Sequence, residues 1–141
     1  MKREQGGAIV EFAMMMPLML ILTFVTTEFG RAYYQYNTLA KNVREAARYL
    51  SVRAQGVGTA QAKNIIVYGN PAGTGTPVMP RLSVSNVPNP TYATSGSLPV
   101  ITTVTVTVTG YTFTPMVPSV FGFPLNAITF GPIRATMRSP T

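Results

Sequence analysis

The sequence predicts an α+β protein in which a long N-terminal helix packs on a small antiparallel sheet of three or four strands. Residues 7–27 form an almost uninterrupted apolar run that would span about 31 Å as a helix, enough to cross the hydrocarbon layer of a bilayer. An amphipathic pattern then continues the helical period to about residue 54. The C-terminal part contains alternating Val and Thr, the pattern of half-buried strands.

Residues 7–29 are predicted to form the transmembrane helix, preceded by a short polar segment at residues 1–6. Pro17 removes a backbone hydrogen bond and should kink this helix. Glu11 is the single charged residue in the apolar run. A carboxylate in the middle of a bilayer costs roughly 2.5–3.5 kcal/mol on insertion scales, so Glu11 predicts a functional role.

The end of the apolar run is marked by Glu28, Phe29, Gly30 and Arg31. Glu28 and Arg31 stand three residues apart and can pair on a helix surface. Three tyrosines between residues 33 and 36 follow, as in the aromatic belt at a membrane–water interface.

Residues 30–55 predict an amphipathic continuation of the same helix, because apolar residues recur at steps of three and four. The expected buried stripe comprises Ala32, Tyr36, Leu39, Val43, Ala46, Ala47 and Leu50. The first plausible stop is the Gly-rich segment at residues 56–58, so the helix is expected to end near Ala54.

Residues 56–141 are predicted to form a small extracytoplasmic α+β domain. It begins with a short helix at 60–68, capped by Thr59 and ended by Gly69. Alternation of apolar residues with serine predicts a short strand at 82–85.

The clearest strand signal is at residues 100–109, where valines alternate with threonines. After Gly110 the large residues change parity, which predicts a bulge or bend there. A last strand is expected at 127–138, split by Pro132 as an edge strand or a bulge would allow.

The connection at residues 115–125 is unusually apolar and contains Phe121 and Phe123. Two interpretations are equally open. The phenylalanines form an exposed contact surface, or they fold under the sheet as a second small core.

Composition excludes several classes of function. The chain has no Cys and no His, so it offers no thiol chemistry and no zinc site of the usual kind. Four scattered Glu are the only acidic residues, and they provide no paired-carboxylate mechanism. We therefore expect no enzyme and no cofactor. The net charge of +7 comes from dispersed Lys and Arg, which does not favour a nucleic-acid partner.

The spacing at the N-terminus resembles a type IV prepilin processing site. Gly6 is followed by four residues and then by Glu11 and Phe12. In the Flp-type branch of that family an aromatic residue, usually Tyr, follows the Glu, and Phe12 departs mildly from it. The resemblance implies that residues 1–6 are a prepilin leader, which a prepilin peptidase removes by cleavage between Gly6 and Gly7. It also implies that Glu11, once buried among packed helices, pairs with the new amino terminus of a neighbouring subunit.

Over most of its length the chain resembles TadE-like proteins, the minor pilins or pseudopilins of the tight-adherence (Flp) pilus system. The resemblance is strongest over residues 6–51, with Glu11-Phe12, Pro17, residues 28–31 and residues 47–49 at the expected spacing. It implies a pilin-like fold and a single-pass protein of the bacterial inner membrane. The N-terminus would be cytoplasmic and the domain periplasmic or extracellular, possibly within a pilus. Implied partners are the prepilin peptidase, other Tad pilins and pseudopilins, the inner-membrane assembly platform and the lipid bilayer.

One alternative stays open. A signal-anchored scaffold protein of the envelope that is not cleaved, and that binds a secretion partner through its domain, would have the same apolar helix. Such a protein would have no need of Glu11.

Overall fold

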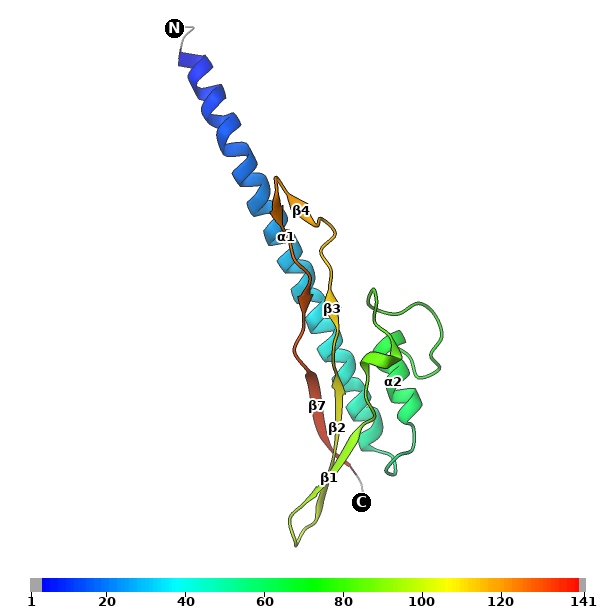
Figure 1. The fold of residues 1–141 in the computed structure, drawn as a ribbon. Helices are drawn as coiled ribbons and strands as arrows, with labels where there is room; N and C mark the ends of the chain where they lie inside the picture. Colours follow the sequence, from blue (N-terminus) through cyan, green and yellow to red (C-terminus); the bar gives the residue numbers. More distant parts are fainter. Residues whose placement is uncertain (1–3, 140–141) are drawn as a thin grey trace. The chain divides into compact units, whose positions relative to one another are not determined.

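A computed structural model describes residues 4–139, with side chains from residue 6 onward, and it confirms the α+β class (Figure 1). Helix α1, Glu4–Ser51, begins the chain, and an antiparallel sheet follows in the C-terminal part. Two compact units are present. The first comprises residues 1–33 and 114–128, and the second comprises residues 34–113 and 129–141. Helix α1 contributes its N-terminal half to the first unit and its C-terminal half to the second.

Helix α1 runs through Pro17 and Gly30 without interruption and ends at Ser51, three residues before the predicted end. Near the end of the apolar run the hydroxyls of Thr23, Thr26 and Thr27 each donate a hydrogen bond to the carbonyl four residues earlier, at 2.7–2.8 Å. Their polar groups are therefore satisfied within the helix, which makes them compatible with an apolar environment.

The second unit is organised around one hydrophobic core, to which α1, α2 and the sheet all contribute. Helix α2, Thr59–Tyr68, contributes one buried face to this core. Burying apolar side chains from three elements stabilises this unit through the hydrophobic effect. Its buried members include Leu39, Val43, Ala46, Ala47 and Leu50 of α1, Ala62, Ile65, Ile66 and Val67 of α2, and Val104, Val106, Val108 and Ile133 of the sheet.

The buried stripe of α1 differs from the predicted one in two places: Asn42 is buried as well, with its Nδ2 donating a hydrogen bond of 3.2 Å to the Ile66 carbonyl, and Gln35 takes the place of Tyr36. Tyr36 is exposed, and its ring meets Phe130 edge-on with centroids 5.5 Å apart. The neighbouring Gln35 is buried instead, because the hydroxyl of Tyr111 donates a hydrogen bond of 2.8 Å to its Oε1. Burying a side-chain amide costs free energy unless the amide has such a partner. The periodicity of the sequence could not predict this partner.

Three strands form the main sheet in the order β1-β2-β7, with antiparallel pairing throughout. Strand β2, Ile101–Val108, confirms the Val/Thr prediction: its valines are buried and Thr103, Thr105 and Thr107 lie on the outer side, while Thr102 is buried on the valine side. Strand β7, Ile133–Ser139, is an edge strand that begins directly after Pro132, as the position of that proline predicted. Strand β1, Thr91–Ser95, was not predicted, because its residues are mostly exposed and show little alternation.

Gly110 adopts a left-handed backbone with φ 68°, which changes the side-chain parity of the chain as predicted. Tyr111 and Phe113 are buried after it. Strand β3, Thr112–Phe113, pairs with β6, Ile128–Thr129, and strand β4, Ser119–Val120, pairs with β5, Phe123–Pro124.

Two local predictions are wrong. Residues 82–85 form no strand; Val84–Asn86 is a 3-10 helix, because the side-chain oxygen of Asn86 accepts hydrogen bonds from the backbone and hydroxyl of Ser83. Thr59 does not cap α2. Gly58 occupies that position in a left-handed conformation, and the Thr59 hydroxyl donates to the Gly56 carbonyl instead.

Candidate functional site

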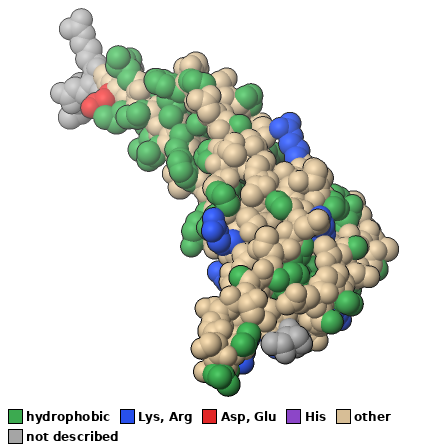
Figure 2. Space-filling model, turned by 60° about the horizontal axis from the view of Figure 1, so that its bottom comes forward, with side chains coloured by type: hydrophobic (Ala, Val, Ile, Leu, Met, Phe, Trp, Pro, Cys, Tyr) green, Lys and Arg blue, Asp and Glu red, His purple; other side chains and the backbone are tan. Residues whose placement is uncertain are grey.

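The N-terminal half of α1 exposes nearly all of its side chains. Figure 2 shows hydrophobic side chains crowding the surface of this part of the helix. They include Ile9, Val10, Phe12, Met14, Met15, Leu18, Met19 and Leu22, each more than half exposed. Among the described residues, α1 is the one helix that is long and apolar enough to cross a membrane. The rest of the protein buries none of its most apolar stretch. An apolar surface of this extent requires lipid or other protein as its environment.

Gly6 and Gly7 lie in the first turns of α1, and the side-chain position of each is open, with no atom within 4 Å of an added Cβ. Glu11 and Phe12 follow one turn later, and both are exposed. Among residues 6–139, no hydrogen bond or ion pair engages the Glu11 carboxylate. The predicted cleavage and recognition residues therefore share one accessible helical segment, while their roles stay predictions.

The residues at the end of the apolar run make a specific set of contacts. The Glu28 side chain is buried and its Oε2 accepts a 2.7 Å hydrogen bond from Nη1 of Arg31, which confirms the predicted pairing. Its Oε1 accepts a second hydrogen bond, at 3.0 Å, from the backbone N–H of Met116. Phe29 is exposed, and the side-chain position of Gly30 is open. The Met116 contact joins segments far apart in the sequence, so spacing along the helix could not have predicted it.

The predicted contact loop forms the β4–β5 hairpin. Phe121 and Phe123 are each 62% exposed, which excludes the interpretation that they form a second small core. Phe121 and Gly122 carry positive φ values of 48° and 83° at the turn, as a two-residue hairpin turn requires. Val120 is the buried residue of this hairpin.

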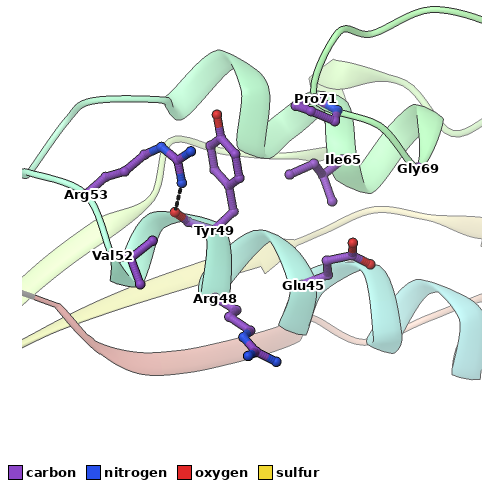
Figure 3. A pocket seen from close by; sticks show the side chains of 8 residues that line it. All are labelled: Glu45, Arg48, Tyr49, Val52, Arg53, Ile65, Gly69 and Pro71. Atoms are coloured by element: carbon purple, nitrogen blue, oxygen red, sulfur yellow. Dashed lines mark hydrogen bonds between the residues drawn. The ribbon is translucent and has the colours of Figure 1, made fainter.

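A shallow pocket that the sequence did not indicate lies in the second unit, between the end of α1 and α2 (Figure 3). The Arg53 guanidinium stacks 3.4 Å above the Tyr49 ring and donates a 2.6 Å hydrogen bond to the Tyr49 carbonyl. The side chains of Glu45 and Arg48 point away from these two residues. Arg53 thus satisfies a backbone carbonyl at the end of the helix.

Buried polar chemistry elsewhere in the second unit is structural. Besides Gln35, the Tyr111 hydroxyl contacts the Pro80 carbonyl at 3.2 Å. Burial raises the pKa of Tyr111 above its usual value of 10.0, because the charged phenolate would lose its hydration. The described part of the chain contains no cluster of three His, Cys, Asp or Glu that could hold a metal ion.

Comparison with protein families gives one match, to the TadE-like protein family, over residues 6–48. Neither the curated proteins nor the solved structures contain a match to the chain. The matched segment covers the exposed apolar helix, Glu11, the Glu28–Arg31 pair and most of the buried stripe of α1. A match to this family indicates a Tad pilus-associated protein, and the apolar helix indicates membrane anchoring. The resemblance predicted from the sequence is thus confirmed over residues 6–48, which form a TadE-like segment, and over the rest of the chain it stays a prediction.

Proposed function

We propose that this protein is a minor pilin or pseudopilin of the Tad pilus system, anchored in the membrane by α1 and processed between Gly6 and Gly7. The observation that carries the proposal is the Glu11 carboxylate on a bare apolar helix within the TadE-like match. A charge in this position is costly in lipid. Assembly with neighbouring helices would supply a cationic partner and so offset that cost.

In this proposal the residues have separate roles. Gly6 and Gly7 flank the scissile bond. Neither has a side chain beyond hydrogen, and the space around both is open, so a peptidase can reach the bond. Glu11 and Phe12 are the recognition residues, and after cleavage Glu11 sets the axial register against the amino terminus of another subunit. Residues 7–29 are the polymerising helix, residues 30–55 connect it to the domain, and residues 56–141 form that domain. The N-terminus is cytoplasmic, and the domain lies on the other side of the inner membrane. The partners are the prepilin peptidase, other Tad pilins and the assembly platform, and the role is not enzymatic.

The test is the mass of the intact protein from cells with and without the prepilin peptidase. We expect the mature chain to begin at Gly7 only when the peptidase is present. Glu11→Gln is the matched variant, because it keeps the size of the side chain and removes the charge. We expect this variant to be inserted in the membrane but not assembled. A chain that keeps residues 1–6 in the presence of the peptidase would contradict the proposal and favour the uncleaved scaffold. Pilus formation at the normal level by Glu11→Gln would show that the charge has no role in assembly.

A further inference from the structure

The β4–β5 hairpin presents an apolar surface that the proposed function does not use. We call residues 114–128 the apolar hairpin. This segment contains no Lys, Arg, Asp or Glu. Its tip exposes Phe121 and Phe123, and Met116 at its base is 74% exposed. An uncharged surface with large apolar side chains at its tip is suited to an apolar partner rather than to water.

The apolar hairpin belongs to the same compact unit as the membrane half of α1. Its base is held there by the hydrogen bond between the Met116 N–H and Oε1 of Glu28. Figure 1 shows the segment that leads to β4, drawn in orange, continuing along α1 toward the N-terminus before it turns back. The tip therefore lies beside the apolar run and on the membrane side of Glu28.

A partly covered stripe on α1 shows how far this contact extends. Ile21 and Val25 are half-buried and Glu28 is buried, whereas Leu22 and Phe24 on other faces of the helix are exposed. Steps of four and three residues place the covered positions on one helical face. Residues 114–128 are the only other part of this unit, and the Met116–Glu28 hydrogen bond places them against the end of this stripe. The stripe is about 10 Å long, comparable with the interfacial zone and the adjoining acyl chains of one leaflet.

The backbone of the apolar hairpin is also suited to an environment poor in water. Unpaired backbone N–H groups are costly in lipid, and three positions in this segment are prolines, which have no N–H. The Met116 N–H is bound by Glu28, and the Leu125 N–H donates to the Pro118 carbonyl at 2.8 Å. Val120 and Phe123 face each other in the short ladder. The prolines are Pro115, Pro118 and Pro124.

We propose that the apolar hairpin is a second membrane contact, with Phe121 and Phe123 inserted in the interface of the leaflet from which α1 emerges near Glu28. Insertion of the helix brings the tip to this depth in every copy of the protein, before any assembly. Two points of attachment, one spanning and one interfacial, would restrict rotation of the first unit about the helix axis. The proposal rests on membrane insertion of α1, and it is independent of cleavage and of pilus formation.

Tryptophan fluorescence tests the proposal, because the chain contains no native Trp. The full-length variant Phe123→Trp is reconstituted in phospholipid vesicles, with bromine placed either near the headgroup end or near the methyl end of the acyl chain. We expect blue-shifted emission and stronger quenching by the headgroup-proximal bromine. The matched control is Leu98→Trp, at a tip of the second unit that is 96% exposed. Its emission should be that of Trp in water, without quenching.

A third variant, Phe24→Trp, reports insertion of α1 itself and should be quenched in the same vesicles. If Phe24→Trp is quenched while Phe123→Trp behaves like Leu98→Trp, the hairpin proposal is wrong and the membrane anchor stands. Blue-shifted but unquenched emission of Phe123→Trp would place the tip in a protein environment instead of lipid and would overturn the proposal. Absence of quenching in Phe24→Trp would overturn both the hairpin contact and the membrane anchor on which the proposed function depends.

Discussion

The two halves of helix α1 have the same backbone structure and opposite environments. In the first unit Leu18 and Leu22 are each 69% exposed, whereas in the second unit Leu39 and Leu50 are completely buried. Both halves keep the helical hydrogen-bond pattern, apart from the bond that Pro17 cannot donate. The difference lies in what covers the side chains, which is the protein's own core in one half and an external apolar environment in the other.

This contrast separates two sources of stability. The C-terminal half is stabilised by packing against α2 and the sheet, which the chain supplies itself. The N-terminal half gains little from its own chain beyond the stripe that ends at Glu28, so lipid or neighbouring helices must provide the rest. A substitution should therefore affect folding in one half and membrane insertion or assembly in the other.

The largest effect is expected for a truncation in the buried half. Leu39→Ala should lower the free energy of unfolding of the second unit by about 2–5 kcal/mol, because it removes apolar contacts and leaves a cavity. The measurement is hydrogen–deuterium exchange of the β2 amides in detergent-solubilised full-length protein. Leu18→Ala is the matched control and should leave this exchange unchanged. An equal loss in both variants would show that the halves of α1 are not independent.

A charge in the exposed half should disturb insertion instead of folding. Leu18→Lys places an ammonium group near the middle of the apolar run and should disfavour insertion by roughly 2.5–3.5 kcal/mol. The measurement is the fraction of protein that resists alkaline extraction from membranes. Val52→Lys, at an exposed apolar residue of the second unit, should be extracted no more than wild type. Equal extraction of Leu18→Lys and Val52→Lys would contradict the difference between the two halves of α1.

A smaller effect is expected where a polar group is buried in the second unit. Tyr111→Phe removes the hydrogen bonds to Gln35 and Pro80, and it should lower the free energy of unfolding by about 1–3 kcal/mol because the Gln35 amide loses its partner. Exchange of the β2 amides measures this change as well. Tyr34→Phe, at an exposed tyrosine of α1, should have no effect.

The smallest effect is a pH dependence of the same residue. The pKa of Tyr111 is raised by desolvation, so the folded state retains its proton at a pH where the unfolded state loses it. The free energy of unfolding should be insensitive to this group below pH 10.0, its ordinary value, and should fall as the pH rises above that value toward the folded pKa. Unfolding at a series of pH values gives the slope. Tyr111→Phe should reduce this decline, and an unchanged slope in the variant would contradict the assignment.

Much of the fold could be predicted because it depends on local periodicity. The length of α1, the Val/Thr strand β2 and the split before β7 follow from spacing that any chain with this sequence carries. The strand predicted at 82–85 failed because Ser83 and Asn86 hydrogen-bond locally, and side-chain capping of that kind overrides a weak alternation of apolar residues.

The candidate site divides in the same way. Glu11 and the Glu28–Arg31 pair could be identified from the sequence, because an acid in an apolar run and a pair at helical spacing are local signals. Two contacts could not be identified. Tyr111 binds Gln35, and Met116 binds Glu28, across separations of 76 and 88 residues, and no periodic pattern encodes such pairs.

The sequence by itself determined that this chain has a long helix with an apolar half, an amphipathic half and a single acid, Glu11, within the apolar half. It did so because helix and strand periods, and the cost of a charge in an apolar run, depend on neighbouring residues alone. Tertiary structure decided that Gln35 rather than Tyr36 faces the core, and that the apolar hairpin is attached to α1 through Glu28. These outcomes depend on which distant groups satisfy a buried amide or carboxylate, and only the folded chain brings those groups together.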